Sequence, residues 1–222
     1  MKTVAVVPIK MNNERLPGKN TKCFDNGEPL VTHVLKTLKK VKNIDEIYCF
    51  CSNEAIKEFL PDGVKYLKRE EWLDLSTTSI TDVLTSFANN VYADIYVLVH
   101  ATAPFITHES IYKGVEAVKS GKYDSSLSVE RLQEFMWKDG KPFNYSLEKI
   151  PRTQDLDPMF CETSGFFAYT KELMLNEHRR VGHNPFLVEV SKIEATDIDE
   201  PEDFEIANAI YNFIVMKREN NE

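Results

Sequence analysis

Short apolar segments alternate along this chain with longer stretches in which apolar residues recur every three or four positions. The short segments, 3–9, 44–51 and 94–100, are rich in β-branched and aromatic residues, which is typical of buried strands. The longer stretches, 29–43 and 79–91, have the spacing of amphipathic helices. This order predicts a doubly wound α/β fold, in which helices cover both faces of a mostly parallel sheet.

The chain is long enough to form one large domain. It has 222 residues, of which 42% are hydrophobic, and this favours a single domain over residues 1–222. Further helices are predicted at 53–60, 107–123 and 200–218. Sheets of this kind bind ligands beyond the carboxyl ends of their strands. We therefore expect the functional residues in the loops that follow the three predicted strands.

The pattern changes in the middle of the chain. Residues 125–165 alternate apolar and polar side chains, and they contain Asp139-Gly140, a dipeptide typical of two-residue β-hairpin turns. We predict a small antiparallel lobe over about 125–165, at the edge of the main sheet. The segments 164–170 and 185–191 again have the composition of strands.

The composition argues against several classes of partner. The formal net charge is -8 and the sequence pI is about 5.3, which argues against a nucleic-acid-binding protein. No apolar run approaches the ~20 residues that span a bilayer, so no membrane partner is expected. Cys23, Cys49, Cys51 and Cys161 lack zinc-site spacing. We interpret them as buried free thiols and take the cytoplasm as the default location.

The loop after the first predicted strand gathers cations and amides. Its sequence, VVPIKMNNERLPGKN at residues 6–20, places three cations and three amides around the turn-forming Pro17-Gly18; they are Lys10, Asn12, Asn13, Arg15, Lys19 and Asn20. Backbone N–H groups and cations in such a loop can bind a polyphosphate, although a solvated basic loop is the alternative. The loop is neither a GxxxxGK[ST] nor a GxGxxG motif.

Two aspartates near the C-terminus form a candidate metal site. In an extended chain, Asp197 and Asp199 present both carboxylates on one side, and such a pair suits Mg²⁺ bound to phosphates. The alternative is that Asp199 caps the last helix. Glu202 and Asp203 fall in the first turn of that helix, where acidic groups favour the helix dipole and cap N–H groups.

Histidine and arginine residues elsewhere leave several interpretations open. His100 ends a buried strand at the edge where ligands bind, and it is a candidate base, substrate contact or core residue. The basic segment HRRVGHNP, residues 178–185, either is solvated or reaches the ligand of a neighbouring subunit.

The opening loop resembles the signature loop of the CMP-sugar-acid synthetases, the acylneuraminate and Kdo-type cytidylyltransferases. The Kdo branch has Arg-Leu-Pro-Gly-Lys, and this chain carries RLPGK at 15–19; Asn20 then completes the Lys-Asn ending of the sialic-acid branch. The loop departs from the family at Lys10, where the family has arginine, and at Asn13, where it has serine. Lysine keeps the charge of arginine but not its bidentate geometry.

Other segments resemble the same family in the same order along the chain. Residues 51–56 and 68–84 resemble its motifs after the second strand, and Arg69 matches an arginine near the nucleotide. Residues 150–169 resemble an Arg-Gln-Asp…Asn-Gly segment, in which the matching positions are Arg152, Gln154, Asp155 and Gly165, with Ser164 in place of the asparagine.

Two further segments complete the resemblance. Residues 99–107 keep Thr102, but His100 replaces a glutamine that contacts the sugar acid in the family, and Ile106 replaces an arginine. Residues 195–207 resemble the metal-binding Asp-x-Asp segment and the helix after it. The resemblance thus covers essentially the whole chain.

The resemblance implies a fold and an activity. The fold is a Rossmann-like, mostly parallel sheet of the nucleotide-diphospho-sugar transferase type. The activity is the transfer of CMP from CTP to a sugar acid, an acylneuraminate or related nonulosonate, with release of pyrophosphate. Mg²⁺ is the implied cofactor, and the lobe would form a homodimer. The alternatives are a different acid acceptor, Kdo or a phosphonate, or a non-catalytic nucleotide-binding protein of the same fold.

The resemblance also implies a role for each candidate residue. The catalytic residues would be Lys19 and Asp199, and the metal ligands would be Asp197 and Asp199. The nucleotide would be bound by Lys10, Asn13, Arg15, Lys19, Asn20 and Arg69. The acceptor would be bound by His100, Thr102, Arg152 and Gln154.

Overall fold

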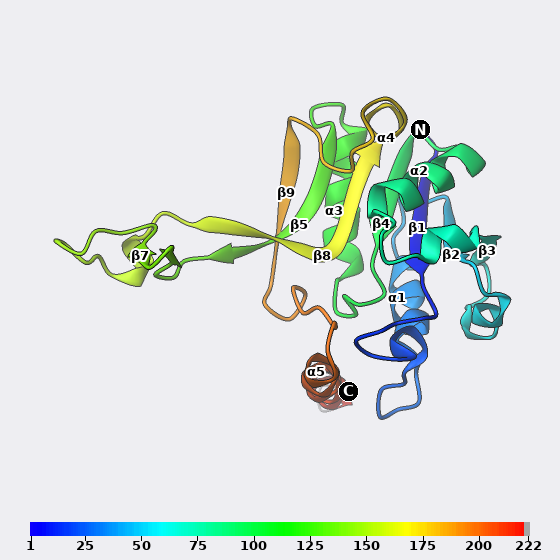
Figure 1. Cartoon of the computed structure of the whole chain (residues 1–222), viewed down its shortest axis with the longest axis horizontal. Coiled ribbons are helices and arrows are strands. Elements are labelled where there is room, and N and C mark those ends of the chain that lie inside the picture. Colours follow the sequence, from blue (N-terminus) through cyan, green and yellow to red (C-terminus); the bar gives the residue numbers. More distant parts are fainter. Residues whose placement is uncertain (220–222) are drawn as a thin grey trace.

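The computed structural model describes residues 1–219 and contains a seven-stranded sheet (Figure 1). The strand order is β3-β2-β1-β4-β8-β5-β9. The strands are β1 (Thr3–Ile9), β2 (Glu46–Cys51), β3 (Lys65–Lys68), β4 (Ile95–Val99), β5 (Ser125–Leu132), β8 (Met159–Thr170) and β9 (Pro185–Val190). Only β8 runs antiparallel to both of its neighbours, so the predicted mostly parallel sheet is confirmed. Residues 220–222, the end of the predicted domain, lie outside the described residues.

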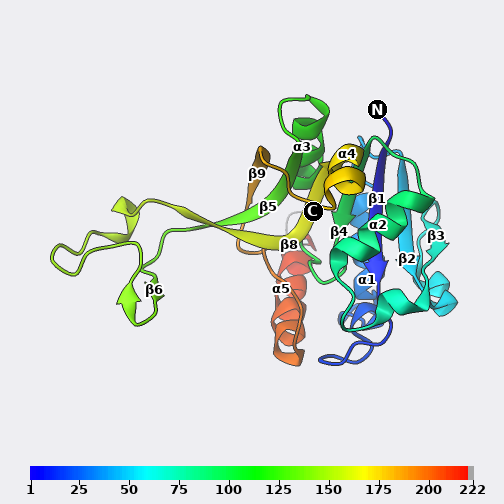
Figure 2. The same ribbon diagram turned by 45° about the horizontal axis from the view of Figure 1, so that its top comes forward.

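The helices connect these strands. The α-helices are α1 (Leu30–Leu38), α2 (Ile80–Asn90), α3 (His108–Lys119), α4 (Lys171–Glu177) and α5 (Pro201–Glu219). The 3-10 helices are η1 (Lys19–Thr21), η2 (Glu54–Phe59), η3 (Glu71–Asp74) and η4 (Thr153–Asp155). Side-chain caps explain several starts: Ser79 and Asp82 form a reciprocal capping box on α2, and Thr107 caps α3. Figure 2 shows α5 on the side of the carboxyl end of β1, next to α1, where the rings of Tyr211 and His33 lie 5.5 Å apart.

Most predicted elements are present, with two informative differences. The predicted strand 3–9 has the observed bounds of β1. The helix predicted at 29–43 ends at Leu38, and the segment 53–60 forms the 3-10 helix η2 rather than an α-helix. Strand β3 was not predicted, because it is four residues long with a lysine at each end and offers no apolar run.

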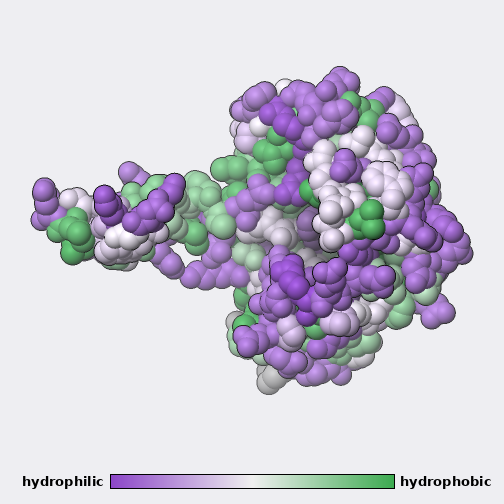
Figure 3. Space-filling view, in the orientation of Figure 1, coloured by the Kyte–Doolittle hydropathy of each residue, from purple (hydrophilic) through white to green (hydrophobic). Residues whose placement is uncertain are grey.

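Residues 133–158 form an arm that projects from the body of the protein (Figures 1 and 3). Its tip carries the two-stranded sheet of β6 (Trp137–Lys138) and β7 (Lys141–Pro142). The turn residues Asp139 and Gly140 both have positive φ, 52° and 72°, as the predicted two-residue hairpin requires. Both ends of the expected lobe at 125–165 belong to the main sheet, because β5 and β8 continue from the sheet into the arm.

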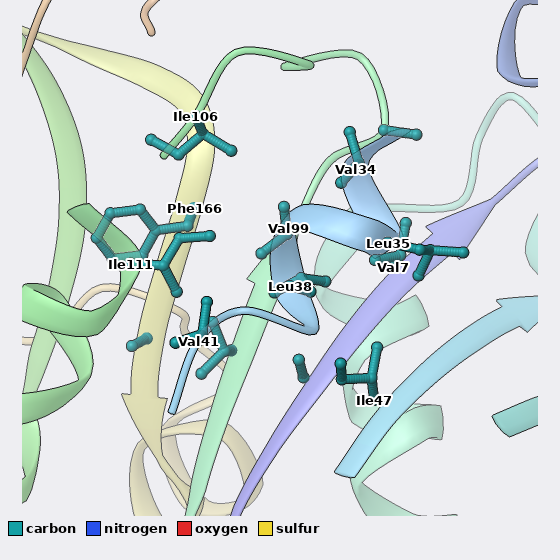
Figure 4. Close-up of a cluster of buried hydrophobic side chains, with 14 of the residues drawn as sticks. Val7, Val34, Leu35, Leu38, Val41, Ile47, Val99, Ile106, Ile111 and Phe166 are labelled. Carbon is teal, nitrogen blue, oxygen red and sulfur yellow. The ribbon is translucent and has the colours of Figure 1, made fainter. Parts of the chain in front are cut away.

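Two apolar layers hold the sheet between helices. One layer, part of which Figure 4 shows, joins α1 and α3 to the sheet through side chains such as Leu35, Ile111 and Val97. The other joins α2 and α4 to the opposite face through Phe87 and Met174, among others. Helices therefore cover both faces, as the sequence predicted for a doubly wound fold.

The cysteines and the helices bear on two other expectations. Cys49 and Cys51 are buried free thiols, as expected, but Cys23 and Cys161 are exposed, so the interpretation of all four as buried was wrong. Both exposed residues lie outside the sheet core, Cys23 in a loop and Cys161 where β8 enters the arm. Within residues 1–219, no helix combines the length and the apolar character that a membrane crossing requires.

Candidate active site

A third apolar cluster brings the opening loop to the chain segment that precedes α5. Leu16 and Phe24 from the opening region pack with Ile198, Phe204 and Tyr211. The rings of Phe24 and Tyr211 stack with centroids 4.4 Å apart and an interplanar angle of 4°. Stacked aromatic pairs of this kind stabilise the contact beyond the burial of their area. Positions separated by about 180 residues in the sequence therefore meet at the carboxyl end of β1.

Lys19 lies at the centre of this contact. Its side chain is buried, and its Nζ donates hydrogen bonds to the carbonyl oxygen of Ile198 at 2.9 Å and to Asp199 Oδ1 at 3.1 Å. Arg15 approaches the same carboxylate, with Nη2 2.9 Å from Oδ1. Asp199 is also the main cause of the raised pKa of Arg15. Gly18, with φ at 69°, forms the turn that directs Lys19 inward.

Asn20 stabilises the opening loop. It is buried, and its Nδ2 donates to the carbonyl oxygen of Lys10 at 2.8 Å and to Asn13 Oδ1 at 3.4 Å. The amide donor is therefore already engaged by the loop itself. Asn20 fixes the path of residues 10–13, and this orients Lys10 and Asn13 toward the space beside Lys19.

These residues line one cavity of about 480 Å³ at the carboxyl ends of β1 and β4. Nine residues assigned to the site from the sequence line it: Lys10, Asn13, Lys19, Asn20, Arg69, His100, Thr102, Asp197 and Asp199. The predicted convergence of the opening loop with the two aspartates is thus observed. Arg15 joins the site through its ion pair with Asp199.

Arg69 is held by acidic and aromatic neighbours. Only 4% of it is exposed; it forms an ion pair with Asp74, which also accepts a hydrogen bond from Ser52. The guanidinium carbon lies 5.9 Å from the ring centroid of Phe50. Its Nε is buried without a hydrogen-bond partner among the described residues.

Part of the cavity wall was not predicted from the sequence. The segment after β3 contributes Leu73, Leu75, Ser76 and Thr78. Leu75 is 59% exposed although it lines the cavity. The available signal was Asp74, an acid five residues after Arg69 and close enough in sequence to pair with it.

Asp197 and Asp199 differ in their contacts. Asp197 Oδ2 accepts a hydrogen bond from Ser164 Oγ at 2.8 Å, whereas its Oδ1 is buried without a partner among residues 1–219. Asp203, in the first turn of α5, accepts at Oδ2 from the N–H groups of Asp199 and Glu200, just before the helix, at 2.9 and 2.8 Å. Among the described residues the Asp199 carboxylate contacts Arg15 and Lys19 and accepts from no N–H group of this first turn, so the alternative of Asp199 as the helix cap has no support.

The two carboxylates fit a magnesium site completed by a ligand. No group of three or more His, Cys, Asp or Glu side chains in the described part of the chain could hold a metal by itself. Mg²⁺ commonly binds through one or two carboxylates together with phosphate oxygens and waters. The carboxylates of Asp197, whose Oδ1 has no partner among the described residues, and of Asp199 line the same cavity and could supply the two protein ligands of such a site.

A bulge in β8 directs Ser164 to Asp197. Leu127 of β5 pairs with Phe167 of β8, and the next paired positions are Val129 and Glu162. β8 therefore has more residues than β5 between these two pairs. The hydroxyl of Ser128 fixes the extra residues by accepting from the N–H of Phe166 at 3.0 Å. A Cβ at Gly165 would overlap Ser128 Oγ and the side chain of Ile106. Bulges commonly redirect side chains at functional sites, and the glycine within a strand pattern was the signal for it.

His100 is a neutral imidazole at the wall of the cavity. Its Nε2 is buried without a partner among the described residues, and its pKa is lowered to about 4. Burial is the main cause, and the positive charge of Arg180 is the next. The ring centroid lies 6.3 Å from that of Phe167. His100 can therefore offer a neutral hydrogen-bonding group to a ligand near pH 7.

Two predicted substrate contacts lie elsewhere in this chain. Arg152 is exposed on the arm and forms two hydrogen bonds with Asp155, at 2.7 and 2.9 Å. Gln154 is beside it, and its carbonyl oxygen accepts from Gln133. Neither lines the cavity of its own chain, because the β5–β8 ribbon carries residues 133–158 away from the sheet edge.

Comparison with known proteins identifies the family. The cytidylyltransferase family model matches residues 4–220. The chain belongs to the cytidylyltransferase family. This agrees with the resemblance that the sequence motifs carry.

The relatives act on several sugar acids. An N-acylneuraminate cytidylyltransferase of Streptococcus agalactiae serotype V is 22% identical over 99% of this chain and 56% of that protein. A CMP-N,N'-diacetyllegionaminic acid synthase of Legionella pneumophila is 27% identical over 95% of this chain and 96% of that protein. The chain thus spans about half the length of the N-acylneuraminate relatives that it matches.

A solved structure shows the same fold. A CMP:2-keto-3-deoxy-manno-octonic acid synthetase, solved in complex with CTP, aligns with a TM-score of 0.74 and 16% identity, covering 96% of this chain and 99% of that chain. The Rossmann-like fold of the nucleotide-diphospho-sugar transferase type is therefore shown. At this identity the likeness supports the fold and not the acceptor.

The burial of His100 predicts a pH-dependent stability. The folded pKa of about 4 lies below the ordinary value of 6.5, so the unfolded chain takes up a proton between these values that the folded chain excludes. The free energy of unfolding should therefore fall by about 2–3 kcal/mol between pH 7 and pH 4.5 through this group alone. Urea unfolding of the wild type and of His100→Gln at both pH values tests this prediction. The wild type should lose more stability than His100→Gln on going from pH 7 to pH 4.5, because only the wild type carries the imidazole. A pH-independent difference would contradict the prediction, and the exposed His183→Gln serves as the control.

Proposed function

We propose that this protein transfers CMP from CTP to a sugar acid, an acylneuraminate or related nonulosonate, and releases pyrophosphate. The observation that carries the proposal is one cavity in which the cations of the opening loop and Arg69 face the Asp197–Asp199 pair. A triphosphate carries about four negative charges, and a protein with a net charge of -8 needs local cations to bind it. The names of the relatives support CTP as the donor and sugar acids as acceptors.

The reaction is a displacement at phosphorus. An oxygen of the acceptor attacks the α-phosphorus of CTP, its proton is lost, and the bond to the pyrophosphate oxygen breaks. Negative charge builds on the phosphate oxygens, and Lys10, Arg15 and Lys19 stabilise it from fixed positions. Lys19 is the best preorganised of the three, because its side chain is buried and held by two oxygen acceptors.

Asp197 and Asp199 would hold Mg²⁺ in this reaction. When bound, the ion supplies positive charge that neutralises the phosphate oxygens and polarises the reacting phosphoryl group. In the structure Asp199 pairs with Arg15 and Lys19. A triphosphate offers both cations alternative partners, which frees the carboxylate for a metal.

The residues on the proposed acceptor side of the cavity favour a nonulosonate as acceptor. Two alternatives remain: a different acid acceptor, and a nucleotide-binding protein without activity. His100, Thr102 and Ser164 line this side and provide neutral hydrogen-bonding groups for hydroxyl or amide substituents. The family's acceptor-contacting arginine is Ile106 here, and that residue is buried in the core. This departure favours testing Kdo and a phosphonate as acceptors. A nucleotide-binding protein without activity is the second candidate, and the retained Asp197, Asp199 and Lys19 argue against it.

The arm supports a homodimer. It exposes five large apolar side chains, each at least 38% accessible: Phe135, Trp137, Phe143, Leu147 and Ile150 (Figure 3). Phe160, at the start of β8 next to the arm, is also exposed. Exposed apolar groups at this density favour burial against another chain, and we propose a second copy as the partner. Arg152 and Gln154 would then reach the acceptor in the partner's cavity. Free cysteines suit a reducing compartment, and we propose the cytoplasm.

Nucleotide and acceptor can be tested together. We expect CTP with Mg²⁺ to raise the melting temperature more than UTP, ATP or GTP, because the cavity would select the pyrimidine as well as the triphosphate. Pyrophosphate release should then depend on one acid from a panel of N-acetylneuraminic acid, N,N'-diacetyllegionaminic acid, Kdo and a phosphonate. CTP binding without release for any acid would favour the non-catalytic candidate, and no preference for CTP would overturn the proposal.

The metal assignment predicts a large loss of turnover. Asp199→Ala should lower kcat by roughly a hundredfold or more at saturating Mg²⁺, because a group that stabilises transition-state charge typically contributes about 3 kcal/mol. Asp197→Asn should act similarly, and it leaves the contact between Lys19 and Asp199 intact. Glu202→Gln, on the exposed first turn of α5, is the control. Near-normal turnover in both aspartate variants, with unchanged melting temperatures, would refute the metal site.

The dimer proposal predicts a change in mass. Trp137→Asp combined with Leu147→Asp should convert a dimer into a monomer in sedimentation experiments, because two charges would be buried without partners at the interface. Ile206→Asp, on the equally exposed surface of α5, should leave the mass unchanged. A wild-type protein that sediments as a monomer at all concentrations would contradict the proposal.

A further inference from the structure

The cavity has an uneven distribution of positive charge. Among the described residues its lining cations are Lys10, Lys19 and Arg69, all from the opening loop and the region after β2 and β3. The side formed by β4 and β8 offers His100, which is neutral near pH 7, and Ser164. A sugar acid bound there would bring a carboxylate close to the negative charges of Asp197 and Asp199. Such an acceptor needs a cation on the β4–β8 side.

Arg180, from the loop between α4 and β9, is placed against that side. Its guanidinium carbon lies 3.9 Å from the ring centroid of Phe167, and that ring is the neighbour of His100. Its Nη2 donates to Glu162 Oε1 at 2.9 Å. Glu162 and Phe167 are the two ends of the β8 bulge that carries Ser164. The guanidinium thus lies beside the β8 segment that carries Ser164. Arg180 itself is not among the residues that line the cavity, so it would meet a ligand only at the rim next to Ser164 and His100.

The electrostatics agree with this placement. The positive charge of Arg180 contributes to the lowered pKa of His100, second only to burial. The guanidinium is therefore within electrostatic reach of an imidazole that lines the cavity. About a quarter of the Arg180 side chain is exposed, and Glu162 is its only hydrogen-bond partner among residues 1–219. Donors remain for an incoming anion.

The loop that carries Arg180 is fixed at both ends. His178 ends α4 in the left-handed conformation with φ at 52°. On the other side, Asp124 Oδ2 accepts from the N–H groups of His183 and Asn184 at 2.7 and 2.9 Å. Gly182 fits only because it lacks a Cβ, which would overlap the Asp124 carboxyl group. The basic segment 178–185 is therefore an anchored loop and not a freely solvated one.

We propose that Arg180 binds the carboxylate of the acid acceptor and determines specificity for acids at this site. The proposal rests on the proposed cytidylyltransferase function. Its chemistry is that of a guanidinium with a stacked face and free N–H donors, which binds carboxylates with two parallel hydrogen bonds. Arg180 takes the role that Ile106, buried 98% in the core, is unable to perform.

Kinetics of Arg180→Met test the proposal. Methionine keeps most of the packing on Phe167 and removes the charge. We expect KM for the accepted acid to rise roughly tenfold to a hundredfold, the worth of a hydrogen bond to a charged group, with KM for CTP within about twofold. Arg179→Met is the matched control, because Arg179 pairs with Glu177 at the end of α4. Equal effects of the two variants, or parallel changes in both KM values, would overturn the proposal.

A modified acceptor separates carboxylate binding from a structural role. The wild type should prefer the acid over its methyl ester, and Arg180→Met should lose most of this preference while the Arg179 variant keeps it. Arg180→Lys should recover part of it, because the charge returns without the planar fork. An acid-to-ester preference unchanged in Arg180→Met, with a normal melting temperature, would overturn the assignment.

Binding measurements keep the test independent of turnover. If the wild type transfers CMP to none of the acids, the proposed function fails while this inference is still tested. N-acetylneuraminic acid, N,N'-diacetyllegionaminic acid and Kdo are then titrated calorimetrically into protein loaded with a non-hydrolysable CTP analogue. Binding by the wild type and its loss in Arg180→Met support the inference. Equal binding by both proteins, or none by the wild type, overturns it.

Discussion

The contact of Lys19 with Ile198 and Asp199 organises this protein. It joins the first loop of the chain to the segment before the last helix, and both of its hydrogen bonds are formed by one buried ammonium group. The stacked rings of Phe24 and Tyr211 stabilise this contact, because they belong to the same apolar cluster as Leu16 and Ile198. A buried cation is costly without acceptors, so the two segments must meet for Lys19 to be accommodated. The shape of the cavity follows from that requirement.

The internal ion pairs of the site could be replaced by contacts with a bound ligand. Asp199 is the partner of two cations, whereas Asp197 has one oxygen without a partner in the described part of the chain. Phosphates and a divalent ion would replace the internal pairing by a larger set of opposite charges. An enzyme with an acidic surface can in this way bind an anionic nucleotide, since only the local field in the cavity has to be positive.

Strands β5 and β8 pair within the main sheet, form part of the cavity wall through Ser164, and continue into the arm. Their inner ends pair within the main sheet, and their outer ends form the ribbon that leads to the apolar tip. The bulge between these parts presents Ser164 to Asp197 and supports Arg180 through Glu162 and Phe167. If the proposed acceptor site and homodimer hold, a change in the ribbon would therefore affect both.

The sequence by itself determined the fold class and most of the residues that line the cavity on the side proposed for the nucleotide. Buried strands and amphipathic helices have distinct periods, and a basic loop directly after the first strand has to lie at the carboxyl edge of a parallel sheet. This argument, together with the family resemblance, predicted that Lys19 and Asp199 lie in the same site. Only the tertiary structure decided that Asn20 braces its own loop and that Arg152 and Gln154 lie away from the cavity. It also placed Arg180 beside Phe167. These outcomes depend on strand register, a bulge and side-chain packing between distant segments, and none of these leaves a periodic signal in the chain.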